Sequence, residues 1–169
     1  MTLKGPLFEL TRKSPVGRLT LVASEDALVG LFMEVSGSEV PVAEKRHTAL
    51  LDRVSAELDE YFEGTRESFD IPLAPEGTDF QRRVWAVLET IPFGTTCSYA
   101  EVARKVGRPR AVRAVGAANG RNPISIIIPC HRVIGADGSL TGYGGGLPRK
   151  RWLLAHEKVE LPLGLGPQI

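Results

Sequence analysis

The sequence predicts an α+β fold, in which a small N-terminal α/β subdomain with antiparallel strands precedes a mainly helical C-terminal domain. Two observations support this prediction. Two apolar runs near the N-terminus are separated by a short polar break, and two later segments begin with helix-capping patterns. The linker at 74–77 contains Pro and Gly, so we expect the domains to be 1–77 and 78–169.

The N-terminal domain is expected to hold a hairpin and one long helix. Apolar-rich runs at 18–24 and 27–34 flank Glu25 and Asp26, which indicates a β-hairpin. A helix is expected over about 42–63, because Gly64 suits a C-terminal cap and apolar residues recur at helical spacing, namely Leu50, Leu51, Val54, Leu58, Tyr61 and Phe62. Residues 69–73 are a candidate for one more strand. We expect a structural role for this domain, since His47 stands alone in it.

The C-terminal domain is expected to begin with a capped helix. Thr78 and Gln81 form a capping-box pattern, and apolar residues at helical spacing follow, namely Phe80, Val84, Val87, Leu88 and Ile91. Pro92, Phe93 and Gly94 are expected to end this helix.

A helix-turn-helix is predicted at about 98–119. Ser98 and Glu101 form a second capping-box pattern, opening a helix through Val106. Gly107 can adopt the left-handed cap conformation, the residues at 108–110 favour a tight turn, and a second helix covers about 111–119. This arrangement is typical of proteins that bind DNA.

The second helix of this motif has an unusually smooth surface. Its one long side chain is Arg113, whereas its other residues are mostly small, namely Ala111, Ala114, Gly116, Ala117 and Ala118. A helix that reads base edges needs several long polar side chains. The surface therefore suits either close packing of another helix or the walls of a DNA groove, and the basic residues beside it favour the groove. Binding is then expected to depend little on base sequence.

Charge is distributed unevenly along the chain. Residues 1–77 carry eight Lys and Arg against fourteen Asp and Glu, whereas residues 78–169 carry thirteen against six. Six cations fall within eighteen residues: Arg104, Lys105, Arg108, Arg110, Arg113 and Arg121. Such a basic half is typical of a protein that binds a polyanion. The alternative is a solvated surface that the acidic half balances.

Composition excludes several other classes. The chain has the hydrophobic and charged fractions of an ordinary soluble globular protein, no apolar stretch of membrane-spanning length and no signal-peptide pattern at its start. Two cysteines are too few for a disulfide scaffold, which favours a reducing compartment, the cytoplasm or nucleoid. With no CxxC pattern and three scattered histidines, a zinc site is not expected.

Cys130 is the strongest candidate for chemistry. The apolar run 124–128 is most simply a buried strand, and Cys130 follows it in a turn that contains Pro129. A lone cysteine is usually an inert buried residue. Here, however, His131 and Arg132 come next, and an imidazole and a cation favour the nucleophilic thiolate. Cys97 has no such neighbours and is expected to be structural.

The segment Ile-Pro-Cys-His-Arg-Val at 128–133 resembles the O6-alkylguanine-DNA alkyltransferase family. The resemblance extends to Arg-Ala-Val-Gly at 113–116, Asn-Pro at 122–123, Gly-Tyr-Gly-Gly-Gly at 142–146 and Leu-Leu-Ala-His-Glu at 153–157. It is continuous over about 78–158, whereas the N-terminal part matches in length and layout only. It implies DNA repair by irreversible transfer of an alkyl group from O6-alkylguanine, or O4-alkylthymine, in duplex DNA to a cysteine. The reaction would be a single turnover after base flipping, performed by a monomer without cofactor or metal.

The resemblance also implies catalytic roles. Cys130 is the alkyl acceptor, His131 takes its proton through a bound water, and Glu157 orients that histidine. Tyr99 donates a proton to the departing guanine and helps to rotate the nucleotide. Asn122 braces the turn between the recognition helix and the active site.

Binding roles follow from the same resemblance. Arg113 fills the space left by the flipped base. Backbone groups of Cys130, Val133 and Gly144 read the guanine, and Tyr143 lines the pocket. The remaining positions implied in DNA binding are Tyr99, Ala100, Arg108, Ala114, Gly116, Ala117 and Ala136. Ser125 stands where some relatives have proline, which puts the width of the pocket in question.

Two alternatives from other classes remain. A non-enzymatic helix-turn-helix regulator would bind one operator sequence without needing Cys130, but the short side chains of the second helix argue against it. A thiol hydrolase would use Cys130 and His131, but it leaves the basic helix-turn-helix unexplained.

Overall fold

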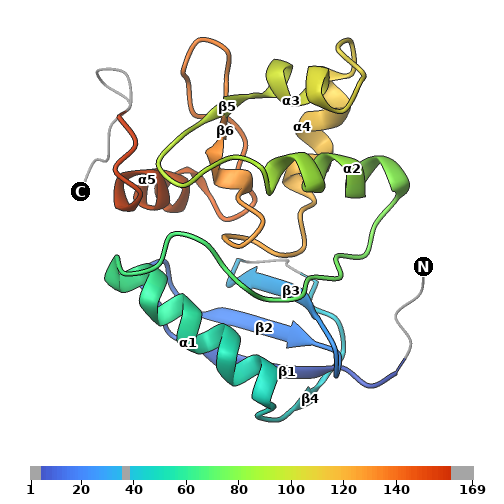
Figure 1. Ribbon diagram of the computed structural model, residues 1–169, viewed down its shortest axis with the longest axis vertical. Coiled ribbons are helices and arrows are strands. Elements are labelled where there is room, and N and C mark those ends of the chain that lie inside the picture. Colours follow the sequence, from blue (N-terminus) through green and yellow to red (C-terminus); the bar gives the residue numbers. More distant parts are fainter. Residues whose placement is uncertain (1–4, 36–38, 161–169) are drawn as a thin grey trace. The chain divides into compact units, whose positions relative to one another are not determined.

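The computed structural model describes residues 5–35 and 39–160, and its fold is α+β, as the sequence predicts (Figure 1). The chain forms two compact units. One comprises Met1–Glu76 together with Pro123–Ile127, and the other comprises Gly77–Asn122 and Ile128–Ile169. The segment 123–127 thus belongs with the N-terminal unit, although it follows the predicted boundary by many residues. None of the helices in the described ranges is long and apolar enough to cross a membrane.

A four-stranded sheet forms the first unit. The predicted hairpin is confirmed as β2 (Leu19–Ala23) and β3 (Leu28–Met33), which pair antiparallel. β1 (Phe8–Arg12) adds antiparallel to β2, and the short β4 (Glu44–Lys45) adds parallel to β1, which gives the order β3-β2-β1-β4. The sequence does not predict β1, because its mixed polar and apolar residues leave it only partly buried.

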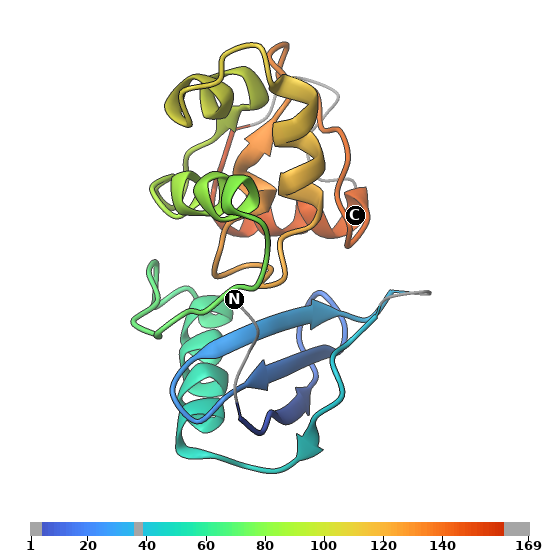
Figure 2. The same cartoon turned by 90° about the vertical axis from the view of Figure 1, so that its right-hand side faces the viewer.

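One long helix covers a face of this sheet (Figure 2). α1 (Ala49–Glu63) ends where predicted, with Gly64 in the left-handed conformation at φ 83°. Its predicted start near residue 42 is wrong. Thr48 is the N-cap, because its side chain accepts a hydrogen bond from the Leu51 amide, and the residues before it include β4.

Two predicted strands, at 69–73 and 124–128, are wrong. Leu73 makes a single parallel bridge to Leu28, and Ile124 makes a single parallel bridge to Leu31. Ile126 has φ 71°, which no strand residue adopts, so the backbone turns immediately after the bridge. The run 124–128 is nevertheless apolar because it is buried, as predicted, except at Ser125.

The second unit is mainly helical. Its elements are α2 (Asp79–Leu88), β5 (Cys97–Ser98), α3 (Tyr99–Lys105), α4 (Val112–Gly120), η1 (Cys130–Arg132), β6 (Val133–Ile134) and α5 (Leu147–His156). The capping box of Thr78 and Gln81 is confirmed, with both reciprocal hydrogen bonds present. Trp85 of α2 is buried and donates its indole N–H to the Ala118 carbonyl, at 2.8 Å, which ties α2 to α4.

The helix-turn-helix is confirmed as α3 and α4. Ser98 caps α3 by accepting from the Glu101 amide at 3.1 Å. Glu101 completes no capping box with Ser98. Its carboxylate instead accepts a hydrogen bond from the Cys97 thiol, at 3.4 Å. Gly107 has φ 79°, the left-handed conformation that the sequence predicts.

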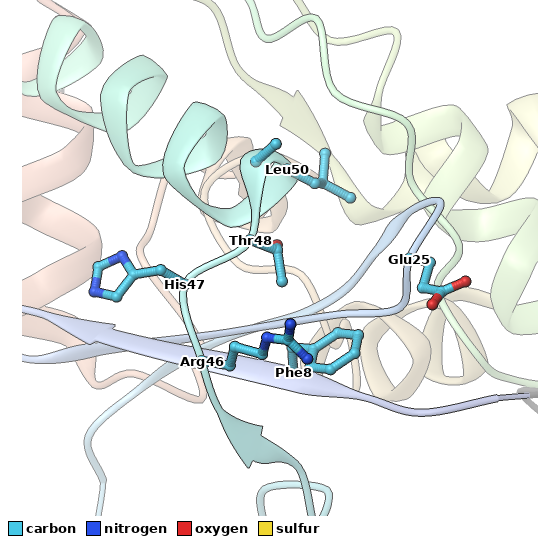
Figure 3. A pocket seen from close by; sticks show the side chains of 7 residues that line it. Phe8, Glu25, Arg46, His47, Thr48 and Leu50 are labelled. Carbon is cyan, nitrogen blue, oxygen red and sulfur yellow. The ribbon is translucent and has the colours of Figure 1, made fainter.

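A cavity of about 300 Å³ lies in the first unit (Figure 3). Its lining residues are Phe8, Glu25, Arg46, His47, Thr48, Ala49 and Leu50. The Arg46 guanidinium lies over the Phe8 ring, 5.6 Å from its centre, and His47 is engaged by Asp52 at 2.7 Å. The side chains of Arg46 and His47 are exposed, so this cavity holds no buried polar group that could act on a ligand.

Candidate functional site

Cys130 lies on a buried turn that two asparagines hold. It opens η1, its side chain is buried, and its amide donates to the Ile128 carbonyl at 2.8 Å. From beyond the end of α4, Asn122 donates its side-chain amide to the same Ile128 carbonyl at 2.7 Å. From the last turn of α4, Asn119 donates to the carbonyl of Cys130 at 3.4 Å. The turn that carries Cys130 is therefore fixed to the second helix of the helix-turn-helix.

A short parallel strand pair places a second segment beside Cys130. β6, which follows η1 directly, pairs with β5, with Cys97 opposite Val133. Tyr99 comes immediately after β5 and begins α3. The pairing therefore brings Tyr99 near Cys130, close enough for a charge on the cysteine to raise the pKa of the tyrosine in addition to the larger effect of burial.

His131 and Glu157 form a fully shielded pair. The Nε2 atom of His131 lies 2.7 Å from Oε2 of Glu157, and neither side chain is exposed to solvent. Burial lowers the pKa of His131, which keeps the ring neutral. With the Nε2 proton donated to Glu157, Nδ1 is left as an acceptor, and it has no hydrogen-bond partner among the described residues. The ring is therefore able to take up a proton at Nδ1.

Arg132 occupies the other side of Glu157. Its Nε donates to Oε1 at 2.7 Å, its Nη2 donates to Oε2 at 3.1 Å, and its Nη1 donates to the Ile91 carbonyl at 2.7 Å. Burial alone would raise the pKa of Glu157, but the hydrogen bonds and charges of His131 and Arg132 hold it well below its usual range. The expectation that Arg132 supplies the charge that favours the Cys130 thiolate is wrong, because its guanidinium is bound to Glu157 and to a backbone carbonyl.

The thiol of Cys130 is protonated at rest. Burial raises the pKa of this thiol, and this effect outweighs hydrogen bonding from Asn122, the charge of Lys150 and hydrogen bonding from Tyr143, which each lower it. The prediction that the neighbouring imidazole and cation favour the thiolate is therefore wrong for the resting protein. The site instead provides a neutral histidine that can accept the proton, together with one buried cation, Lys150.

Lys150 is not among the site residues that the sequence predicts. It lies in the first turn of α5, is completely buried, and donates to the carbonyls of Val133 at 2.6 Å and Thr141 at 3.1 Å. Tyr99 donates its hydroxyl to the same Thr141 carbonyl at 3.0 Å. Lys150 stands in the run Arg-Lys-Arg, which has the pattern of a solvated basic surface, so the sequence carries no signal that this one cation is buried.

The helix-turn-helix presents a smooth exposed surface. Arg113, Ala114 and Ala117 of α4 are exposed, and Arg113 makes no hydrogen bond or ion pair with any described residue. A Cβ atom built on Gly116 would lie 4.0 Å from the Tyr99 ring, so α4 approaches the start of α3 closely at this position. The outer face of α4 is thus free of long side chains except at Arg113.

The remaining predicted positions lie around this arrangement. Arg108 is exposed, with its guanidinium 5.7 Å from the centre of the Phe80 ring. A Cβ atom on Gly144 would lie 3.8 Å from the Gly120 carbonyl oxygen, which places the glycine-rich loop beside the end of α4. Ala136 is exposed, Ala100 and Tyr143 are half-buried, and Val133 is buried. No group of three or more His, Cys, Asp or Glu within the described ranges could hold a metal ion.

Comparison with known protein families gives two matches that together cover most of the chain. Residues 79–159 match the DNA binding domain of 6-O-methylguanine DNA methyltransferase, and residues 7–75 match the ribonuclease-like domain of the same enzyme.

Individual relatives agree with these family matches. A methylated-DNA–protein-cysteine methyltransferase from Methanosarcina acetivorans is 48% identical over 147 residues, which cover 86% of this chain and 94% of that protein. One from Mycobacterium tuberculosis is 49% identical over 160 residues, which cover 92% of this chain and 94% of that protein. A crystal structure described as Mycobacterium tuberculosis OGT in complex with DNA superposes with a TM-score of 0.84 at 47% identity, covering 95% of each chain.

Proposed function

Because the chain belongs to the family of methylated-DNA–protein-cysteine methyltransferases, we propose that Cys130 is the residue that accepts the alkyl group. The protein is an enzyme of DNA repair that binds DNA and transfers an alkyl group from a methylated base to one of its own cysteines. The observation that carries the assignment to Cys130 is that Asn119 and Asn122 bind its turn to the end of α4 and that His131, which pairs with buried Glu157, follows it directly.

The other cysteine is a poor candidate. The Cys97 thiol donates to the Glu101 carboxylate, and burial together with this carboxylate raises its pKa. A thiolate at this position would face a negative charge. The charges of Lys105 and Arg104 lower the pKa of Cys97 by less than burial and Glu101 raise it, whereas the charge that acts on Cys130 is that of Lys150, with no carboxylate of the described residues opposing it.

We propose the following reaction. The Cys130 thiol gives its proton through one water to Nδ1 of His131, and Glu157 stabilises the imidazolium that forms. The sulfur then attacks the alkyl carbon on O6 of guanine, so that a C–S bond forms as the C–O bond breaks. The bonding electron pair of the broken bond stays with the guanine, which takes a proton from the Tyr99 hydroxyl. Transfer of a proton from His131 back to Tyr99 completes the balance.

The product explains a single turnover. Freeing the cysteine again would require displacement of its thiolate, a poor leaving group, from an alkyl carbon, and no group described in the site is placed to catalyse that step. Each protein molecule would therefore repair one lesion and remain alkylated. Because every group in this reaction comes from one unit of one chain, the protein is expected to act as a monomer.

Access to the lesion requires base flipping. An alkyl group on O6 of a stacked guanine is out of reach, so the nucleotide must leave the duplex, at a cost of a few kcal/mol. The smooth face of α4 allows close approach to a groove, and exposed Arg113 is the one long side chain on it that can fill the vacated stack. Ala100, Arg108, Ala114, Gly116, Ala117 and Ala136 would contact the DNA backbone or lie against it.

Recognition of the flipped guanine is assigned to backbone groups. The carbonyl of Val133 accepts a hydrogen bond from Lys150, and the carbonyl of Cys130 accepts from the Asn119 side chain and from the Val133 amide. We propose that backbone groups of Cys130, Val133 and Gly144 read the guanine and that Tyr143 closes the pocket, which at the Cys130 carbonyl requires exchange of one of its two present hydrogen bonds. We place this activity in the cytoplasm, at the nucleoid, where DNA is the substrate and thiols stay reduced.

The assignment is tested by locating the alkyl group. The parent protein is incubated with an equimolar duplex that contains one O6-methylguanine, digested with protease and examined by peptide mass spectrometry. We expect the methyl group on the peptide that contains Cys130. A methyl group on the Cys97 peptide, or none on either, would contradict the proposal.

A further inference from the structure

The positive charge of Lys150 is unfavourable for the stability of the folded protein in two ways. Its side chain is completely buried, and burial lowers the pKa of Lys150 to about 8. It also lies in the first turn of α5, where the helix dipole disfavours a positive charge. A leucine or methionine would fill the same space without either penalty. A buried cation in such a position is therefore a candidate for a functional role.

The contacts of Lys150 show what it holds. Its ammonium group donates to the carbonyls of Val133 and Thr141, which lie at the two ends of the segment that joins β6 to the glycine-rich loop. Its Nζ atom lies 5.9 Å from the centre of the Tyr99 ring. One buried cation thus contacts the backbone beside Cys130, the loop that carries Tyr143, and the side chain of Tyr99.

The carbonyl of Thr141 is expected to lose one of its two hydrogen-bond donors during the reaction. In the free protein its carbonyl accepts from both Tyr99 and Lys150. If Tyr99 donates its proton to guanine, the hydroxyl must leave Thr141, whereas Lys150 can remain. The loop would then stay in place while the tyrosine is engaged with substrate.

We propose that Lys150 is a positioning residue of the alkyl-transfer site, which anchors the Thr141 and Val133 carbonyls and supplies the positive charge that favours the Cys130 thiolate. This inference rests on Cys130 being the alkyl acceptor. The titratable groups that face this charge are Tyr99 from α3 and Cys130 and His131 from η1. The influence is mutual, because a negative charge on Cys130 favours protonation of Lys150.

The first test measures the ionisation of Cys130 directly. In a Cys97→Ser background, the rate at which iodoacetamide alkylates Cys130 is followed against pH for the parent chain, Lys150→Met and Lys150→Arg. An opposite charge nearby lowers a pKa by about one unit or more. We therefore expect Lys150→Met to raise the apparent pKa of Cys130 by that amount and to slow its reaction with free O6-methylguanine about tenfold at neutral pH. Lys150→Arg should restore much of the pKa and less of the rate, since a guanidinium does not fit between the two carbonyls.

Controls separate this inference from the proposed function. Lys45→Met removes an exposed lysine from the other unit and should leave the pH profile of Cys130 unchanged. If O6-methylguanine does not alkylate Cys130 in the parent chain, the proposed function is wrong. If the parent reacts there but Lys150→Met has the same thiol pKa, only the role of Lys150 is wrong.

A second measurement needs no substitution of Lys150. The Nζ atom of a buried lysine can be titrated by heteronuclear NMR in the Cys97→Ser background with Cys130→Asp and with Cys130→Ser. We expect a higher pKa for Lys150 with Asp, because its carboxylate places at position 130 the negative charge that the thiolate would carry, whereas a hydroxyl does not ionise in this range. Equal pKa values for Lys150 in the two proteins would overturn the proposal even if Lys150→Met failed to fold.

Discussion

The Nε2 atom of His131 lies 2.7 Å from Oε2 of Glu157, and both side chains are shielded from solvent in the second unit of the protein. Arg132 donates to the same carboxylate, so one buried carboxylate accepts hydrogen bonds from two neighbouring residues of η1. The pair fixes the ring orientation of His131 and leaves Nδ1 to accept a proton. We therefore expect the catalysis and the stability of this unit to depend on the same carboxylate.

Glu157→Gln is expected to weaken both properties. Removing one partner from a buried ion pair leaves an uncompensated charge, here on Arg132, so the free energy of unfolding at pH 7 should fall by about 3 kcal/mol. The single-turnover rate of alkyl transfer should fall at least about tenfold, because the imidazolium loses its counter-charge. Chemical denaturation and quenched-flow measurements check these two values. Glu160→Gln, at an exposed position, is the matched control, and equal effects of the two variants would contradict the account.

The stability of the folded protein should fall as the pH drops below about 6.5. The pKa of folded His131 lies below that of an exposed histidine, so the unfolded chain binds the proton first. The stability contributed by neutral His131 is present above about pH 6.5 and is lost on acidification, with a slope of at most about 1.4 kcal/mol per pH unit. Urea denaturation between pH 7 and pH 5 measures this slope. His131→Leu should remove the contribution of His131 to the slope of unfolding free energy against pH. An unchanged slope in the variant would mean that His131 is not the group that titrates.

Binding to DNA should depend strongly on salt and weakly on base sequence. Phosphate contacts from the basic residues of the second unit would release counterions, and α4 offers few side chains that could read bases. Fluorescence anisotropy with two unrelated duplexes, from about 50 to 200 mM salt, should show a steep and nearly identical loss of affinity. Strong preference for one duplex, or affinity independent of salt, would favour the alternative of a sequence-specific regulator.

Arg113→Ala should separate base flipping from chemistry. The exposed guanidinium is proposed to fill the vacated stack, so its loss should slow repair of duplex DNA by about a hundredfold or more, since each ~1.4 kcal/mol is tenfold. Reaction with free O6-methylguanine base needs no flipping and should change little. Both rates are measured as single turnovers.

Two further variants sharpen the test of Arg113. Arg113→Lys should recover the duplex rate only in part, because a planar guanidinium stacks between bases and an ammonium group does not. Arg121→Ala removes another exposed arginine, at the C-cap of α4, and should affect the duplex rate much less. If Arg113→Ala slowed the duplex and free-base reactions equally, Arg113 would act on the thiol or on folding.

Local signals in the sequence predict the elements that position the site. Thr78 and Ser98 cap helices through side chains that bind backbone amides three residues on, and Gly107 tolerates the left-handed conformation after α3, so the helix-turn-helix could be located without knowing what packs on it. The predictions that failed depended on distant contacts. The run 124–128 is apolar because it is buried, yet a left-handed residue at Ile126 prevents a strand, and isoleucine gives no sign of that conformation.

The chemical groups of the site likewise fall into those that local sequence predicts and those that distant contacts place. Cys130 and His131 are adjacent in sequence, so their cooperation could be proposed from spacing, and the link to Glu157 came from resemblance to a family. The sequence does not indicate which groups each cationic side chain binds. Arg132, beside the cysteine, donates hydrogen bonds to Glu157. The charge that lowers the pKa of Cys130 is instead that of Lys150, twenty residues further along the chain. Pairing of β5 with β6 and the docking of α5 decide this, and neither leaves a local pattern in the sequence.

The central claim is that Cys130 takes one alkyl group and keeps it. Cys97→Ser and Cys130→Ser are each incubated with an excess of duplex that contains O6-methylguanine, and the intact proteins are weighed by mass spectrometry while the remaining lesions are counted. The account predicts that every Cys97→Ser molecule gains one methyl group and removes one lesion, and that Cys130→Ser binds the duplex but gains no mass. Methylation of Cys130→Ser, or removal of many lesions by each molecule of Cys97→Ser, would contradict it.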